Sequence, residues 1–144
     1  MTIANILKGK HTAVLWVPPA LAVGAAAERL RSANVGVMIV SNDGESVLGL
    51  ISERDIAHGL AVHGAALPSL KVSDLMARSV ITCTPEDSVA EIARIMTMRR
   101  IRHIPVTDGG KVVGVVSIGD VLKSRISEVE LEANLLRDLA VAHR

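Results

Sequence analysis

Two serine–aspartate pairs in this sequence have the spacing and the setting of a ligand-binding group. Ser52 stands three residues before Asp55 and Ser117 stands three residues before Asp120, each pair after a short apolar run. If a helix begins at the serine, its first turn offers unpaired N–H groups and partial positive charge, which suit a phosphate. The aspartate offers two acceptor oxygens, which suit a cis-diol such as a ribose. The same residue types also form a capping box with Asp in place of Glu, so a single pair is equally well explained as a helix cap.

The pairs belong to an internal duplication, which favours the binding interpretation. The segment Gly49–Asp55 recurs as Gly114–Asp120, 65 residues later, with glycine, two apolar residues, serine and aspartate in the same places. Gly49 and Gly114 are expected to let a ligand approach the backbone closely. Six earlier positions match at an offset of 66 residues: Val14 with Val80, Pro19 with Pro85, Val23 with Val89, Ala27 with Ala93, Val40 with Val106, and Gly44 with Gly110. The chain therefore contains one structural unit twice.

Each copy is expected to fold as strand, helix, strand, turn, strand and helix. In the second copy Thr84 is the expected N-cap and Pro85 the first helical residue. The residues of Asp108–Gly110 predict a turn, and the apolar run Val112–Val116 predicts a strand covered on both faces. The other elements expected in this copy are a strand over 80–83, a helix through 96, a strand over 104–106 and a helix over 117–126. In the first copy the corresponding first helix begins at Pro18-Pro19.

The predicted organisation is linear along the chain. Residues 1–64 form the first repeat, 65–72 a linker, 73–126 the second repeat and 127–144 a C-terminal helix. The segment Ser127-Glu128-Val129-Glu130 has the pattern of another capping box and is expected to open this last helix. Because the helix carries Leu135, Leu136 and Leu139, it is expected to pack on its own domain or on a second subunit.

The composition restricts the classes of function. The chain has 144 residues, a formal net charge of +1, one Trp and no Phe or Tyr. It offers almost no aromatic surface on which bases could stack, and no electrostatic reason to expect a nucleic acid or an anionic membrane as its main partner. The single cysteine, Cys83, cannot form an internal disulfide, and no segment approaches the roughly 20 apolar residues of a membrane span. We therefore expect a cytoplasmic protein.

The other candidate residues are better explained by structural roles than by catalysis, metal binding or nucleic-acid binding. His58 and His63 lack Cys or carboxylate partners at metal-ligand spacing, so solvated histidines near a helix end are expected. Cys83 is expected to be a small buried apolar residue, and Trp16 to fill the core rather than line a cleft. The cluster within Arg99–Arg102 fits a bound phosphate or a solvated surface better than a nucleic acid. No P-loop, Gly-x-Gly-x-x-Gly fingerprint or catalytic triad occurs in the sequence, so neither an enzyme nor a catalytic cofactor or metal is predicted.

The duplicated motif and the segment Arg99–Val106 together resemble a tandem pair of CBS domains, also called a Bateman module. Within that superfamily the chain is most similar to the small stand-alone bacterial proteins, in its Asp74-Leu75-Met76 segment and in the run from Ser117 to Lys123. The resemblance covers about residues 5–126. It implies an α+β (α/β) fold in which two βαββα repeats pack by pseudo-twofold symmetry, followed here by a C-terminal helix. It also implies two clefts between the repeats, in which adenine nucleotides bind.

The resemblance further implies which residues line each cleft. In the Asp55 cleft, Asp55 is expected to hold the ribose hydroxyls, while Ser52 and the helix start face the phosphate. In the Asp120 cleft, Asp120 and Ser117 take the same two roles. The other residues expected in the Asp55 cleft are Leu50, Arg54, Thr84, Ile101, Arg102 and His103. The others expected in the Asp120 cleft are Val35, Gly36, Val115 and Gly119.

The two motifs differ in the charge around them. Three side chains assigned to the Asp55 cleft have uncharged counterparts in the other copy: Arg54 matches Gly119, Arg102 matches Gly36 and His103 matches Val37. Because cations near a phosphate are concentrated there, we expect the Asp55 cleft to bind more tightly.

The sequence thus predicts a regulatory module that binds an adenine nucleotide. AMP is the first choice, with ATP, ADP or NAD as alternatives. The module would signal to an unidentified partner protein through a change in conformation, and a homodimer is expected. Two alternatives from other classes stay open: a ligand-independent dimerisation or interaction scaffold, and a weak enzyme that acts on a bound nucleotide.

Overall fold

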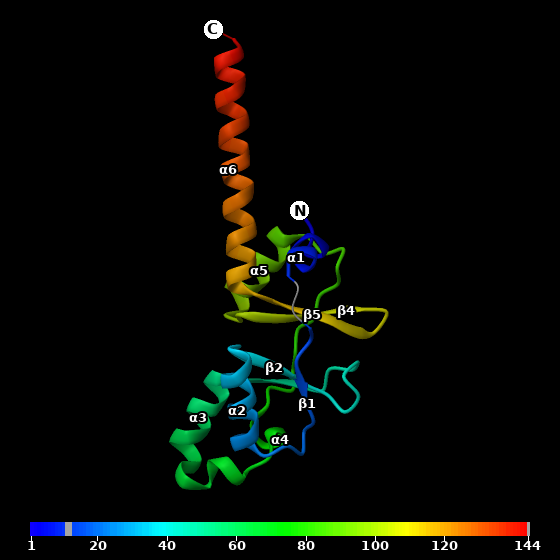
Figure 1. Ribbon diagram of the computed structural model, residues 1–144, viewed down its shortest axis with the longest axis vertical. Helices are drawn as coiled ribbons and strands as arrows, with labels where there is room; N and C mark the ends of the chain where they lie inside the picture. The colour runs from blue at the N-terminus through cyan, green and yellow to red at the C-terminus, as the bar shows by residue number, and fades with distance from the viewer. Residues whose placement is uncertain (11–12, 144) are drawn as a thin grey trace. The chain divides into compact units, whose positions relative to one another are not determined.

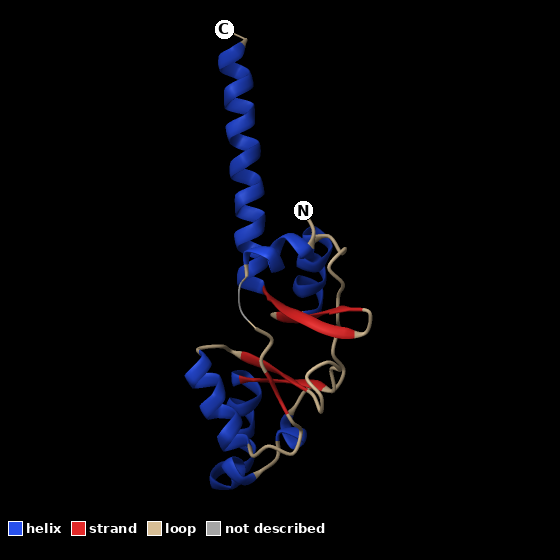
Figure 2. Cartoon of the chain, turned by 45° about the vertical axis from the view of Figure 1, so that its right-hand side comes forward, coloured by secondary structure: helices blue, strands red, loops and turns tan. Residues whose placement is uncertain are grey.

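The computed structural model describes residues 1–10 and 13–143, which fall into two compact units interleaved along the sequence. Unit 1 takes its described residues from 1–11, 83–104 and 116–144, and unit 2 takes them from 12–82 and 105–115. Figure 2 distinguishes the helices, in blue, from the short strands, in red. The fold is α+β, as predicted.

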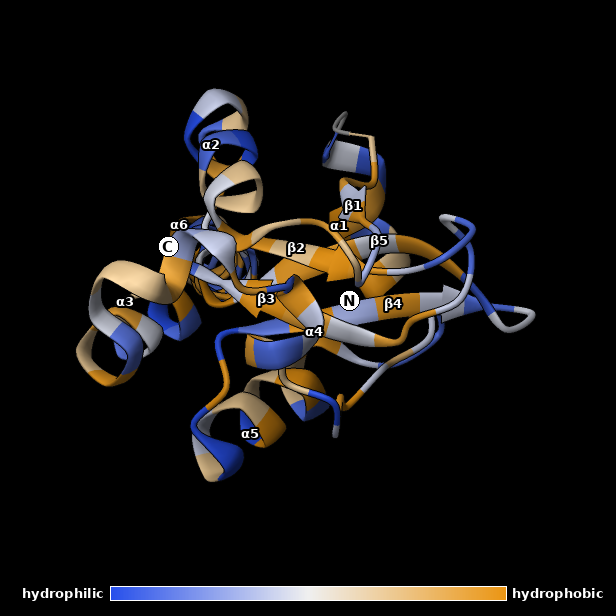
Figure 3. Ribbon diagram, turned by 90° about the horizontal axis from the view of Figure 1, so that it is seen from below, coloured by the Kyte–Doolittle hydropathy of each residue, from blue (hydrophilic) through white to orange (hydrophobic). Residues whose placement is uncertain are grey.

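A three-stranded sheet forms the centre of unit 2. Strand β1 (Trp16–Val17) pairs in parallel with β2 (Val37–Val40), which pairs antiparallel with β3 (Gly49–Ser52). The helices of this unit are α2 (Val23–Ala33), α3 (Glu53–His63), the 3-10 helix η1 (Gly64–Ser69) and α4 (Val72–Leu75). The hydrophobic colour follows β2 and β3 in Figure 3. The buried cluster of this unit consists of Val17, Ala26, Leu30, Met38, Val40, Ile51 and Val72.

Three helices make up most of unit 1: α1 (Ile3–Gly9), α5 (Val89–Arg99) and α6 (Ile118–Ala142). The N-terminal residues are fixed to the start of α5 by backbone hydrogen bonds. The Ile3 N–H donates to the Asp87 carbonyl at 2.9 Å, and the Val89 N–H donates to the Met1 carbonyl at 3.1 Å. Ile3 is fully buried. The first residues of the chain therefore pack with elements of the second copy.

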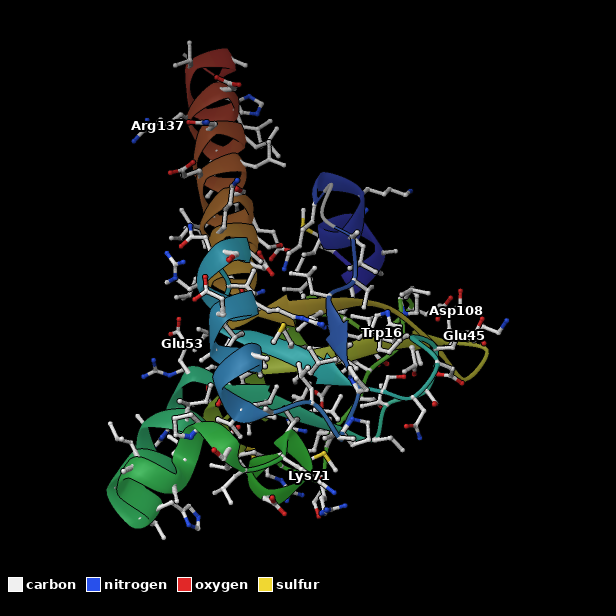
Figure 4. All side chains as sticks on the ribbon, turned by 60° about the horizontal axis from the view of Figure 1, so that its bottom comes forward. Trp16, Glu45, Glu53, Lys71, Asp108 and Arg137 are labelled. Atoms are coloured by element: carbon white, nitrogen blue, oxygen red, sulfur yellow. The ribbon has the colours of Figure 1, made fainter. Side chains whose placement is uncertain are left out.

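A two-stranded hairpin of β4 (His103–Asp108) and β5 (Lys111–Ser117) completes the second copy. Its turn uses Gly109 at φ +59° and Gly110 at φ +81°, which confirms the predicted glycine turn. Near this turn, the Val112 N–H donates to the carbonyl of Glu45 in the same unit at 2.8 Å. The labelled Glu45 and Asp108 lie in this region in Figure 4. Along β5, however, buried and more exposed residues alternate, so the prediction of a strand covered on both faces was wrong.

The first helix of each copy begins several residues after the proline that was predicted to start it. In the second copy the Thr84 N–H donates to Asp87 Oδ2 at 2.8 Å, which makes a turn of residues 84–87. Helix α5 then begins at Val89, with Ser88 accepting from the Glu91 N–H at 3.1 Å. The expected N-cap at Thr84 was therefore wrong, because a second capping pair four residues later starts the helix. In the first copy α2 begins at Val23. Residues 80–83 of the second copy lie outside the named strands, so the strand predicted there was wrong.

The predicted break before the C-terminal helix does not exist. Helix α6 runs without interruption from Ile118 to Ala142 and is drawn as one helix in Figure 2. Ser127 does not cap a new helix, since its hydroxyl donates to the Lys123 carbonyl one turn earlier, at 3.0 Å. The segment lacks Gly and Pro after Gly119 and is rich in Leu, Glu, Ala and Arg, all strong helix formers. No helix of the described residues is long and apolar enough to cross a membrane.

Candidate functional site

The first serine–aspartate pair closes the amino terminus of α3. The Asp55 N–H donates to Ser52 Oγ at 3.2 Å, and Asp55 Oδ2 accepts from both the Ser52 N–H and the Ser52 hydroxyl, each at 2.9 Å. The pair is half-buried where β3 ends. It is thus a reciprocal capping box, as the purely structural explanation predicts. The cap contacts of the Asp55 carboxylate use Oδ2, and Oδ1 takes part in none of them.

The second pair makes the same cap at the start of α6. The Asp120 N–H donates to Ser117 Oγ at 3.1 Å, and the Ser117 N–H donates to Asp120 Oδ2 at 2.9 Å. The two motifs therefore agree in backbone geometry as well as in sequence.

The charge around Asp120 differs from that around Asp55. Lys10, just beyond α1, places Nζ 2.7 Å from Asp120 Oδ2. Burial alone would raise the pKa of Asp120, but the Lys10 ammonium and the Ser117 N–H and hydroxyl outweigh it and hold that pKa below its usual value. Nothing in the sequence pattern indicated Lys10, which is 110 residues away from its partner. The expectation that few cations lie near Asp120 was therefore incomplete.

A cavity of about 250 Å³ within unit 1 opens beside this ion pair. Its lining residues are Met1, Asn5, Ile6, Gly9, Lys10, Asp120, Lys123, Ser124 and Ser127. The side chains of Lys10, Lys123 and Asp120 thus border this hollow near the amino terminus of α6.

Equivalent backbone contacts recur in the two copies. The Glu53 N–H donates to the Gly36 carbonyl at 3.0 Å in unit 2, and the Ile118 N–H donates to the Arg102 carbonyl at 2.8 Å in unit 1. Each bond connects the start of the helix that carries the aspartate to the residue just before the first strand of the preceding strand pair, β2 in one copy and β4 in the other. The duplication is therefore one of structure as well as sequence.

The helix ends before these segments also match. Helix α2 ends at Asn34 with φ +54°, and α5 ends at Arg100 with φ +53°, both left-handed. The next residues then bond back, from the Val35 N–H to the Leu30 carbonyl and from the Ile101 N–H to the Met96 carbonyl, both at 3.1 Å. Val35 and Ile101, one assigned to each cleft, thus take the same position in their repeats.

Gly49 is needed by the protein's own backbone. A Cβ added there would lie 2.5 Å from the Ala77 carbonyl oxygen, a distance that real Cβ atoms do not show. Ala77 is held at this distance by two hydrogen bonds with Leu50, at 2.9 and 3.0 Å. The expectation that Gly49 makes room for a ligand was therefore wrong, because residue 77 takes that space.

The residues predicted for each cleft are divided between the units. For the Asp55 cleft, unit 2 holds Leu50, Ser52, Arg54 and Asp55, and unit 1 holds Thr84, Ile101, Arg102 and His103. For the Asp120 cleft, unit 1 holds Ser117, Gly119 and Asp120, and unit 2 holds Val35, Gly36 and Val115. Arg54 and Arg102 have exposed side chains, whereas Leu50 and Ile101 are half-buried.

Gly36 has an acidic neighbour that the sequence comparison did not consider. A Cβ added at Gly36 would lie 3.6 Å from Glu53 Oε2. Glu53, labelled in Figure 4, is the first residue of α3. A carboxylate therefore lies beside the Gly36 backbone, which was assigned to the Asp120 cleft.

The remaining candidates have mixed outcomes. Cys83 is buried, as predicted, and burial together with the negative charge of Asp87 raises the pKa of its thiol to about 12. The prediction that Trp16 fills the core was wrong, since 39% of its surface is exposed on strand β1. The described residues contain no group of three or more His, Cys, Asp or Glu side chains that could hold a metal ion.

Comparison with known proteins identifies relatives for the whole duplicated region. The CBS domain family matches residues 10–62 and 72–127. The CBS domain-containing protein CBSX3, mitochondrial, of Arabidopsis thaliana is 36% identical over 135 residues, which cover 88% of this chain and 66% of that protein. The chain spans between half and two thirds of the length of the first three curated relatives that it matches. The CBS-domain containing protein ATU1752 from Agrobacterium tumefaciens has a crystal structure with a TM-score of 0.83 and 34% identity, covering 87% of this chain and 99% of that one.

Two more distant solved structures share the fold and contain ligands. The CBS domain pair of protein MJ0100, in complex with 5-methylthioadenosine and S-adenosyl-L-methionine, has a TM-score of 0.78 and 23% identity over 89% of this chain and 98% of that one. CBSX2, in complex with AMP, has a TM-score of 0.75 and 22% identity over 88% of this chain and 97% of that one. All three ligands contain adenosine.

Proposed function

Because this chain belongs to the CBS domain family and contains the domain twice, we propose that it is a regulatory module that binds an adenine nucleotide. AMP is the first choice, with ATP, ADP or NAD as alternatives. The observation that carries the proposal is the repeated cap, in which a half-buried carboxylate stands in the first turn of a helix in each copy. Such a site combines a ribose acceptor with N–H groups that suit a phosphate.

The ligands of the two distant relatives support the choice of nucleotide. AMP, S-adenosyl-L-methionine and 5-methylthioadenosine share the adenine and the ribose but differ in charge at the 5′ position. The arginines assigned to the Asp55 cleft favour a phosphate at that position over a sulfonium, which is itself positive. We therefore place AMP before S-adenosyl-L-methionine.

We propose that the Asp55 cleft binds AMP more tightly than the Asp120 cleft. In this assignment Asp55 holds the ribose, Ser52 and Arg54 face the phosphate, Leu50 lines the adenine, and Thr84, Ile101, Arg102 and His103 complete the site. In the Asp120 cleft the same roles fall to Asp120, Ser117 and Gly119, with Val35, Gly36 and Val115 around the adenine. Two contacts support this ranking: Lys10 already occupies Asp120 Oδ2, and the Glu53 carboxylate lies beside Gly36.

Isothermal titration calorimetry with AMP tests the assignment. Asp55→Ala removes charge-assisted hydrogen bonds of about 1.5–3 kcal/mol, so affinity should fall roughly tenfold to a hundredfold. Asp120→Ala should have the smaller effect. Asp74→Ala is the matched control, because Asp74 caps α4 through the Lys71 N–H at 2.9 Å but belongs to neither predicted cleft. Unchanged affinity in Asp55→Ala would disprove the ribose role, and a larger loss in Asp120→Ala would reverse the ranking.

A thermal-shift panel separates the module from the two alternative functions. A nucleotide present at 100 times its Kd should add about 2.7 kcal/mol to the free energy of unfolding. A scaffold whose clefts stay empty would show no shift with AMP, ATP, ADP or NAD. A weak enzyme would consume ATP or NAD during incubation, which chromatography of the nucleotide detects.

A further inference from the structure

The second half of α6 carries a long apolar surface with no partner in the described chain. The only buried residues of this helix are Val121 and Ser124, both in its first two turns. Figure 1 shows α6 continuing beyond α1 and α5, the other helices of its unit. From Leu122 onward its large apolar side chains are 55–66% exposed, as in Val129 and Leu136. An apolar surface of this extent marks an interaction site.

The spacing of one row on this surface indicates the kind of partner. Alternating steps of four and three residues connect Leu122, Ile126, Val129, Ala133, Leu136 and Ala140. This is the heptad repeat of a two-stranded coiled coil, in which Ile126, Ala133 and Ala140 occupy the a positions and the others the d positions. We call this row the heptad row. A second row, which includes Leu131 and Leu135, lies on another side of the helix.

The charges beside the heptad row specify a parallel pair of identical helices. In a parallel pair each g residue faces the e residue five positions later in the partner helix. Arg125 then faces the partner's Glu130, and Glu132 faces the partner's Arg137, so both contacts join opposite charges. The labelled Arg137 extends away from the helix in Figure 4. Arg125 also donates to Glu128 at 3.0 Å within α6, but its guanidinium has five N–H donors and can accept a second partner.

The opposite orientation is disfavoured by the same charges. An antiparallel pair fills its core best with Ile126 against Leu136 and Val129 against Ala133. In that register Glu130 faces Glu130, Glu132 faces Glu132, and Lys123 faces Arg137. Each of these three contacts joins like charges, which destabilise such pairs.

We propose that residues 122–140 of α6 form a parallel two-stranded coiled coil with the same residues of a second copy of this chain. The coiled coil would be shorter than three heptads and has alanine at two a positions. The pair is therefore expected to associate weakly, so the dimer fraction depends on protein concentration. The interaction surface is independent of the proposed nucleotide clefts, since no residue of the heptad row is assigned to them.

Disulfide trapping tests both the surface and the orientation. Ala140→Cys should crosslink two copies under mild oxidation, because a positions of a parallel pair face each other. In the antiparallel register the two introduced thiols would be about 27 Å apart, beyond the reach of a disulfide. Ala142→Cys is the control, because it is equally near the helix end but lies outside the heptad row. Native Cys83 can stay in place because it is buried.

A second pair of variants shows whether the heptad row is the surface that associates. Leu136→Glu should abolish the Ala140→Cys crosslink, whereas Leu135→Glu, its similarly exposed neighbour in the other row, should leave it intact. Circular dichroism checks that both variants fold, and unchanged AMP binding separates this result from the proposed function. Equal crosslinking of Ala140→Cys and Ala142→Cys, no crosslinking of Ala140→Cys, or equal effects of the two glutamates would overturn the proposal.

Discussion

Asp55 and Asp120 have the same backbone setting but different charge neighbours. Both accept the N–H of the serine three residues earlier at 2.9 Å. Only Asp120 also accepts from an ammonium group, that of Lys10 at 2.7 Å. A ribose at Asp120 must therefore share or displace Lys10, whereas a ribose at Asp55 meets no such competitor among the described residues. One side chain from the start of the sequence is enough to make two identical motifs unequal.

The Lys10–Asp120 pair should make stability depend on pH. Because the folded-state pKa of Asp120 lies below its unfolded value, the stabilisation is fully present above about pH 3.9 and is lost as the pH falls through the folded-state pKa. Lys10→Met should lower the free energy of unfolding by about 0.5–1 kcal/mol at pH 7, and by progressively less below pH 4. Urea unfolding at a series of pH values measures the difference. Lys8→Met, in the same helix end, is the control, and an equal loss in both variants would contradict the prediction.

Cys83 should be chemically inert in the folded protein. The thiolate is the reactive form, and burial raises the pKa of this thiol to about 12. A thiol reagent at pH 8 should therefore modify wild-type protein only after urea is added. The double variant Cys83→Ser, Ser79→Cys moves the single thiol to an exposed position four residues away and should react at once. Fast labelling of native Cys83 would show that this part of unit 1 opens readily.

At the scale of elements, the ends of α2 and α5 have the same backbone conformation but different residues. The left-handed position is filled by Asn34 in one copy and by Arg100 in the other. Asn tolerates this conformation, whereas a long side chain such as Arg costs about 1–2 kcal/mol there. The second copy therefore contains local strain that the first avoids.

Arg100→Gly should relieve this strain. We expect the free energy of unfolding to rise by about 0.5–1 kcal/mol, since glycine adopts positive φ without steric cost but loses more backbone entropy on folding. Arg99→Gly, the preceding residue in α5 with ordinary helical geometry, should instead lower it by up to about 1 kcal/mol. Chemical denaturation of both variants measures the contrast, and a loss of stability in Arg100→Gly would refute the explanation.

The sequence predicted the types of the elements better than their limits. The strands over 104–106 and 112–116 and the helix from Ser117 were confirmed, because their apolar periods and glycine turn are local signals. The start of α5 was wrong because Thr84 and Ser88 are both followed by an acid three residues later, and local pattern does not choose between them. The break at Ser127 was wrong for a related reason. A capping pattern within a segment of strong helix-forming residues does not start a new helix, because the existing helix continues through it.

At the scale of the whole molecule, the duplication was predictable and its interleaving was not. The repeated motif led to the family, which covers residues 10–62 and 72–127. The compact units, however, do not follow that linear order, because residues 1–10 belong with the second copy and residues 105–115 with the first. The linear division at residues 64 and 72 stays a prediction. A contact such as that of Lys10 with Asp120 cannot be recognised from residue spacing. The prediction of the charges around the candidate site was incomplete for this reason.

The packing of α1 has a consequence for how the protein is made. The backbone partners of Ile3 and Ala4 are Asp87 and Pro85, and the partner of Lys10 is Asp120. On the ribosome α1 therefore emerges before its partners and must wait until the residues up to Asp120 have been made. At about 5–20 residues per second this delay is on the order of ten seconds. During that interval Ile3, fully buried in the finished protein, is exposed, so α1 reaches its native position only after α5 and the start of α6 have been made.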